Sequence, residues 1–109
     1  ASDFQPAQAR MFNAQAVLYV TIPVDSSLWS FHDLGAFTAM IALAAVDKGL
    51  GAINAYELVR FPDEVRETMG IGADETVAVG IALGHPADSE LAAFAPSRVD
   101  VDEILTIKD

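Results

Sequence analysis

A run of apolar and small residues from Leu34 to Val46 contains no charged side chain. Hydrophobic positions recur at helical spacing on one side of this run, and further apolar residues and alanines fill the rest of the circumference. A helix that is apolar on nearly every side is predicted to be buried on most of them. The apolar positions on its first side are Leu34, Phe37, Ile41 and Ala45.

The residues at the two ends of this run predict where the helix begins and ends. Asp33 stands at the position of an N-cap, Lys48 lies in the last turn, and Gly49 supplies the left-handed residue that closes the helix. The helix is too short and too rich in alanine to span a bilayer comfortably. We therefore interpret it as a core helix around which the rest of the chain is arranged.

Two further stretches read as strands beside this helix. Alternating and β-branched residues predict a buried strand over Ala16–Val24 and a second strand over Thr76–Gly84. Gly49–Asn54 is predicted to be a turn into a short extended piece. One face of the second strand carries only small side chains, which favours close packing of the alanine-rich helix against it. These small residues are Ala78, Gly80 and Ala82.

The other segments give weaker signals. Residues 1–13 are predicted to form an irregular or weakly helical lead-in, and Asp25–His32 a connection. A proline in the first turn, acidic residues and a final glycine predict a surface helix over Phe61–Gly70. Val99–Ile107 is predicted to be a last strand, but acidic residues interrupt its apolar positions, so an edge strand or a strand that leaves the domain is expected.

Together these elements predict an α+β fold in which an antiparallel or mixed sheet packs on a buried alanine-rich helix. The chain of 109 residues suits one small domain. Three strands and two helices leave much apolar surface uncovered, and a hydrophobic content of 52% with a mean hydropathy of +0.33 is high for a small soluble monomer. We therefore expect either an incomplete domain or obligate association with another chain.

Charge and cysteine content exclude several classes of function. The net charge of -10, from 16 acidic and 6 basic residues, argues against binding to nucleic acid or to an anionic membrane. The absence of cysteine excludes disulfides and thiolate metal ligands, and it agrees with a cytoplasmic location. No signal peptide or membrane span is recognisable, and the start without methionine is expected either of an artificial chain boundary or of a piece of a longer protein.

Few residues carry recognisable chemistry. His32 and His85 lie far apart without ligand spacing, so each is interpreted as a polar residue at a turn rather than an acid or base, and no metal site is expected. The loop Asn54–Glu57 leaves the packed core, where backbone N–H groups can face a ligand, although an ordinary connection explains it equally well. Arg98 can bind an anionic group, or it can pair with a neighbouring aspartate.

The order of several motifs resembles the C-terminal half of the FMN-dependent nitroreductase family, from about Phe12 onward. No single motif is diagnostic, but the ordered set is fairly specific. The set comprises DLGA at 33–36, the alanine-rich helix, KGLGA at 48–52, MGI at 69–71, IALGHP at 81–86, PSR at 96–98 and VDEIL at 101–105.

The resemblance implies an α+β flavoenzyme that works as an obligate homodimer. Its FMN lies in a cleft between the subunits, accepts a hydride from NAD(P)H and passes electrons to nitroaromatic or quinone-like acceptors in ping-pong fashion. The final strand in many members crosses to the partner's sheet, which agrees with a straying strand over Val99–Ile107. The family's N-terminal half is absent, so residues 1–109 match the C-terminal part of a single domain, and this fragment alone is expected to be inactive.

The resemblance also implies which residues bind the cofactor. Asn54, Ala55, Tyr56 and Glu57 match the loop that meets the isoalloxazine ring, with the backbone N–H of Glu57 or Tyr56 near N5. Arg98 matches a basic residue that holds the FMN phosphate.

No catalytic side chain is implied. A second basic residue, common in the family, is replaced here by Pro96. Trp29 and Phe31 either pack in the core or line the acceptor pocket. The alternative to a flavoenzyme is a non-catalytic α/β dimerisation module without bound flavin.

Overall fold

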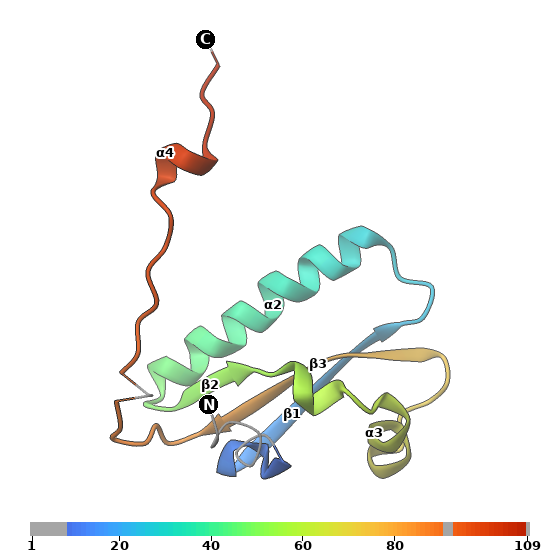
Figure 1. The fold of residues 1–109 in the computed structure, drawn as a ribbon. Coiled ribbons are helices and arrows are strands. Elements are labelled where there is room, and N and C mark those ends of the chain that lie inside the picture. Colours follow the sequence, from blue (N-terminus) through green and yellow to red (C-terminus); the bar gives the residue numbers. More distant parts are fainter. Residues whose placement is uncertain (1–8, 91–92, 109) are drawn as a thin grey trace.

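A computed structural model describes residues 9–90 and 93–108 of the chain. Its centre is an antiparallel sheet with the strand order β1-β3-β2 (Figure 1). The middle strand, β3, is the longest and pairs with both neighbours, so the most buried sheet positions lie on it. The predicted α+β class is confirmed, as are the strands predicted over Ala16–Val24 and Thr76–Gly84 and the short extended piece before Asn54. The bounds are Ala16–Pro23 for β1, Gly51–Asn54 for β2 and Glu75–Gly84 for β3.

The long helix α2 spans Leu28–Asp47 and so begins earlier than the sequence pattern indicated. Ser27 is the N-cap, because its side-chain oxygen accepts a hydrogen bond from the backbone N–H of Ser30 at 3.4 Å. The predictions of an Asp33 N-cap and of a connection as far as residue 32 were therefore wrong. The end of the helix agrees with the prediction, since Gly49 has a φ of 72° and closes the last turn.

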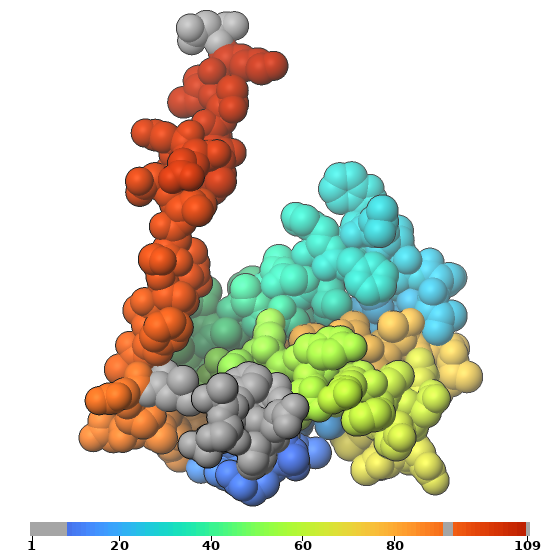
Figure 2. All heavy atoms as spheres, in the orientation of Figure 1, coloured from blue at the N-terminus to red at the C-terminus, as the bar shows by residue number. Residues whose placement is uncertain are grey.

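The predicted burial of α2 on most of its circumference was wrong for this chain. Only Thr38 and Ala45 of the helix are buried, while Met40 and Leu43 are 67% and 70% exposed. The helix rests on the sheet along one narrow stripe, and its atoms form the upper surface of the body in Figure 2. By length and composition alone α2 would also be able to cross a membrane, a property that it shares with core helices of soluble proteins.

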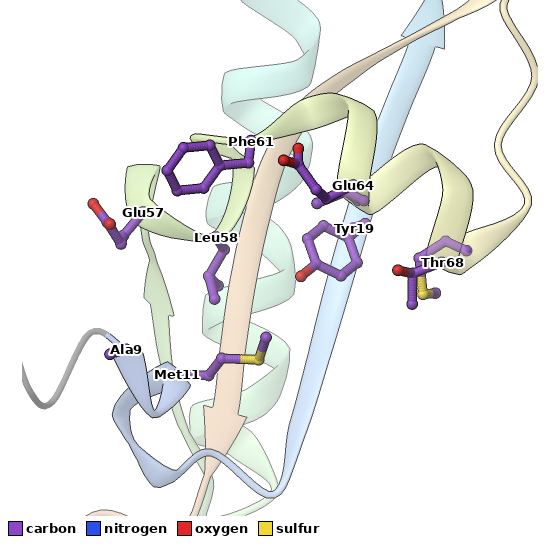
Figure 3. A pocket seen from close by; sticks show the side chains of 10 residues that line it. Ala9, Met11, Tyr19, Glu57, Leu58, Phe61, Glu64 and Thr68 are labelled. Atoms are coloured by element: carbon purple, nitrogen blue, oxygen red, sulfur yellow. The ribbon is translucent and has the colours of Figure 1, made fainter.

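The small-residue face of β3 is covered by a short 3-10 helix, η2 (Tyr56–Val59), and not by α2. Leu58 of η2 packs over Gly80, in the space that a side chain at residue 80 would need. Figure 3 shows this face with α2 behind the strands, so the predicted packing of the alanine-rich helix against the small face was wrong. The core on this face contains Ala55, Leu58 and Ala82, packed against Phe12, Ala14, Val17 and Tyr19.

Helix α3 (Pro62–Met69) follows η2 as predicted. Pro62 opens it, and Gly70, with a φ of 67°, ends it in the left-handed conformation. Arg66 ties this helix to the start of β3, because its guanidinium donates hydrogen bonds to the carbonyl oxygens of Gly72, at 2.6 Å, and Glu75. The position of β3 is therefore coupled to that of α3.

The two ends of the chain contain little regular structure. In the lead-in, the turn η1 (Met11–Asn13) has three consecutive residues with φ between 50° and 57°; residues 1–8 of this predicted segment lie outside the described residues. Towards the C-terminus the predicted strand Val99–Ile107 was wrong, since a one-turn helix, α4 (Val101–Ile104), forms there.

The C-terminal residues 93–108 form an arm that leaves the body of the domain, as expected for a straying segment (Figures 1 and 2). Every residue of this arm is exposed. The radius of gyration is 16.6 Å, whereas a compact domain of this length has about 13 Å. The arm carries apolar side chains that nothing in the described chain covers. These are Phe94, Val99, Val101, Ile104, Leu105 and Ile107.

Candidate functional site

The loop Asn54–Glu57 connects the end of β2 to η2 and is held in place at its centre. The backbone N–H of Ala55 donates to the carbonyl oxygen of Gly80 at 2.9 Å, and Ala55 is only 7% exposed. The side chain of Asn54 donates to the hydroxyl of Thr38 at 3.4 Å. The loop is therefore attached to β3 by its backbone and to α2 by a side chain.

The next two backbone N–H groups, those of Tyr56 and Glu57, stand at the start of η2. The first N–H groups of a helix have no acceptor in a preceding turn. Among the described residues neither group finds an acceptor, whereas the N–H of Leu58 bonds to the carbonyl oxygen of Ala55 at 3.2 Å. Tyr56 is 78% exposed. Two adjacent donors are thus available to a ligand or to another chain.

The side chain of Glu57 is not free to act as an isolated carboxylate. It forms an ion pair with Arg60, at 3.0 Å between Oε1 and Nη1, and the guanidinium of Arg60 lies 5.3 Å from the centre of the Phe61 ring. The pair follows the i, i+3 spacing of the turn. Because the side chain of Glu57 is paired in this way, the groups of the loop that can bind a ligand are its backbone N–H groups.

A pocket of about 310 Å³ lies beside η2, between β1, α3 and the N-terminal turn (Figure 3). Its surface is mainly apolar, and two acidic residues, Glu57 and Glu64, are among those that line it. The sequence predicted the loop but not this pocket, because its walls come from segments distant in sequence. The lining residues are Ala9, Met11, Tyr19, Glu57, Leu58, Phe61, Glu64, Val65, Thr68 and Met69.

Arg98 lies on the C-terminal arm, away from this loop. Its guanidinium donates to the carbonyl oxygens of Pro96 and Ser97, both at 3.1 Å. The expected alternative, an ion pair with Asp100 or Asp102, is not formed within the described part of the arm. The arm that carries Arg98 follows the end of β3, which pairs with the start of β2, and extends away from the body (Figure 1), whereas the loop Asn54–Glu57 follows the other end of β2. This chain therefore does not bring Arg98 and the loop together.

The remaining candidate residues lie at the surface. His32 contacts Asp33, with 3.4 Å between Nδ1 and Oδ1, and His85 uses its backbone N–H to reach the side-chain oxygen of Gln15 at 2.9 Å. Trp29 is 77% exposed, so it does not pack in a core here. Across the part of the chain that the structure describes, no three histidine or acidic residues lie close enough to hold a metal ion.

The chain is similar in structure to solved nitroreductases. The FMN- and NADPH-dependent nitroreductase NfnB from Sphigopyxis sp. strain HMH superposes with a TM-score of 0.83 at 25% identity, over 92% of this chain and 45% of that chain. A point mutant of the same enzyme superposes with a TM-score of 0.88 at 25% identity, and the match covers 99% of this chain and 51% of that chain. The FMN-dependent nitroreductase NfnB from Mycobacterium smegmatis, in complex with NADPH, superposes with a TM-score of 0.86 at 20% identity. This match covers 97% of this chain and 48% of that chain.

The chain thus spans about half the length of these structures. No protein-family model matches the sequence, and no curated protein matches it.

Proposed function

Because the chain has the fold of about half of a nitroreductase, we propose that it is the C-terminal part of an FMN-dependent oxidoreductase of that type. The observation that carries the proposal is the superposition of nearly the whole chain, with TM-scores of 0.83 and 0.88, on structures of which it spans 45% and 51%. The uncovered apolar surface of α2 and of the arm supports the idea of a missing part. We assign the whole of residues 1–109 to a single domain of the parent protein.

The residues of the loop Asn54–Glu57 fit a flavin ring. A ring nitrogen that gains electron density is stabilised by hydrogen-bond donors, and the backbone N–H groups of Tyr56 and Glu57 lack an acceptor within the described residues. When bound, FMN supplies the redox chemistry by accepting a hydride from NAD(P)H and passing electrons to nitroaromatic or quinone-like acceptors. The protein's part is to hold two donors in place and to keep the loop fixed through Ala55.

The FMN phosphate requires a cation that this chain alone does not bring to the loop. We assign the binding of the phosphate to Arg98, which reaches the FMN site of the second subunit when the arm lies against that subunit. Within the described residues its guanidinium forms hydrogen bonds to backbone carbonyls of its own turn, so no acidic partner there has to be displaced. A bidentate contact from arginine to phosphate is roughly twice as strong as a hydrogen bond between neutral groups.

The complete protein is proposed to be a homodimer that is soluble and cytoplasmic. The exposed face of α2, which includes Met40 and Leu43, and the apolar arm are the surfaces for the second subunit. Because the cleft needs both a partner and the missing half, residues 1–109 alone are expected to be inactive.

Spectroscopy and a turnover assay of the complete protein test this function. Purified complete protein is expected to be yellow with a flavin absorbance spectrum and, in the absence of dioxygen, to oxidise NADPH in turnover only when a nitroaromatic or a quinone is added as the electron acceptor. A colourless protein that binds no added FMN would overturn the proposal. Oxidation of NADPH at the same rate without an acceptor would argue against the acceptor class.

The alternative is a non-catalytic dimerisation module, favoured by the same exposed apolar face of α2. It predicts a stable but colourless dimer of the 109-residue chain. Size-exclusion chromatography with light scattering, combined with the absorbance spectrum of the eluted peak, separates the two functions.

A further inference from the structure

Thr38 is the polar residue that the fold buries in the middle of α2, and it is only 4% exposed. A buried hydroxyl costs free energy unless it is hydrogen-bonded. Its Oγ1 donates to the carbonyl oxygen of Gly35 at 3.0 Å and accepts a hydrogen bond from Nδ2 of Asn54 at 3.4 Å. The hydroxyl is therefore satisfied partly within its own helix and partly by the end of β2.

The bond between Thr38 and Asn54 links two separate elements. In the described chain, the other side-chain hydrogen bonds of α2 are local, at Ser27–Ser30, His32–Asp33 and Thr38–Gly35. Within the described chain, Thr38 is therefore the residue of α2 whose side chain forms a hydrogen bond to another element, the end of β2. The element that it holds is the entrance to the loop Asn54–Glu57.

Two anchors now bracket this entrance. The backbone N–H of Ala55 is fixed to the carbonyl oxygen of Gly80 on β3, and the side chain of Asn54 is fixed to Thr38 on α2. The N–H groups of Tyr56 and Glu57 follow immediately, without an acceptor among the described residues. Their direction depends on the peptide planes that precede them, and so on both anchors.

We propose that Thr38 is a positioning residue for the loop Asn54–Glu57: by holding the amide of Asn54, it fixes the direction in which the N–H groups of Tyr56 and Glu57 point. The importance of this direction for a flavin rests on the proposed function. The positioning itself is a property of the chain and is measured without a cofactor.

The test is Thr38→Val in the 109-residue chain, followed by amide hydrogen exchange and NMR of the Asn54 side-chain amide. The substitution keeps the shape of the side chain and removes the hydroxyl. Loss of one hydrogen bond is expected to accelerate exchange of the Ala55 N–H by about 2- to 10-fold and to shift the Asn54 amide resonances. The β3 amides that pair with β1 are expected to keep their exchange rates.

Thr38→Ser keeps the hydroxyl and is expected to restore both signals, while Thr106→Val on the exposed arm makes the same chemical change elsewhere and is expected to alter neither. Unchanged signals in Thr38→Val would overturn the positioning role. So would failure of the serine variant to restore them, or equal acceleration throughout the sheet, which would indicate a general loss of stability.

A second measurement connects the positioning to the flavin. In the flavin-loaded complete protein, Thr38→Val is expected to shift the flavin midpoint potential, and Thr38→Ser, which keeps the hydroxyl, to leave it near that of the unsubstituted protein. An unaltered potential in Thr38→Val would overturn the effect on the flavin. If the complete protein binds no FMN, the proposed function fails, whereas the exchange result on the 109-residue chain still decides the positioning.

Discussion

The side chain of Leu58 in η2 occupies the space directly over Gly80 in β3 that a β-carbon at residue 80 would fill. The contact is made by the β-carbon of Leu58 as well as by its tip, so a rotation of the side chain does not relieve it. The short helix that follows the loop Asn54–Glu57 therefore lies close to the sheet only because residue 80 has no side chain.

Gly80→Ala is expected to destabilise the chain by about 1–3 kcal/mol, because η2 has to move away from β3. The measurement is the free energy of unfolding in urea. Gly35→Ala is the matched control: Gly35 lies in the interior of α2, and a β-carbon there meets no atom within 4 Å. The control is expected to stabilise the chain by roughly 0.5–1 kcal/mol. Equal stability of Gly80→Ala and the unsubstituted chain would contradict the close packing of η2.

Leu43→Glu is expected to weaken the homodimer that we propose for the complete protein. Leu43 is 70% exposed on the face of α2 opposite the sheet, and a carboxylate buried in an apolar interface lacks a partner. A substitution at the centre of an interface costs about 2 kcal/mol or more, roughly a 30-fold rise in the dimer dissociation constant. Analytical ultracentrifugation measures this dissociation constant. Ala73→Glu, on the exposed turn before β3, adds the same charge and is expected to leave the constant unchanged.

Arg66→Ala is expected to reduce the free energy of unfolding by about 1–3 kcal/mol. The guanidinium donates to the carbonyl oxygens of Gly72 and Glu75, and so holds the turn between α3 and β3. Arg66→Lys keeps the charge but not the forked geometry, and it is expected to recover only part of the loss. Thermal unfolding by circular dichroism measures both variants, and full recovery in the lysine variant would show that charge alone matters.

Arg98→Ala is expected to weaken FMN retention in the complete protein without changing the stability of the 109-residue chain. Among the described residues Arg98 forms hydrogen bonds within its own turn, so its removal disturbs no packing of the body. Equilibrium dialysis against FMN measures retention, with Lys108→Ala as a control for the lost charge on the same arm. If FMN affinity is unchanged in Arg98→Ala, Arg98 is not part of the site.

The sequence predicted the elements whose signals are local. Glycines after Lys48 and Met69 both adopt the left-handed conformation that ends a helix, and each was recognisable from its position after an amphipathic or apolar run. Strands β1 and β3 were visible from their β-branched residues. The start of α2 was missed because Trp29 and Phe31 alternate as in an extended segment, although the Ser27–Ser30 pair carried a capping signal.

Features that depend on distant contacts were not predictable in the same way. The sequence showed that β3 has a small-residue face but not that Leu58, rather than the alanine-rich helix, would cover it. The loop Asn54–Glu57 was predicted as a candidate site, whereas the role of Thr38 depends on the approach of α2 to β2. The strand predicted over Val99–Ile107 was wrong because its acidic residues instead begin the short helix α4.

The strand order β1-β3-β2 leaves two outer strands, and within the described residues no further strand pairs with either of them. Unpaired backbone groups along an edge are a template for sheet growth between molecules. The eight residues of β1 offer a longer template than the four of β2, and only the irregularity at Val20–Thr21 and the terminal Pro23 interrupt it. During expression of the isolated chain, β1 is therefore the segment most exposed to intermolecular aggregation.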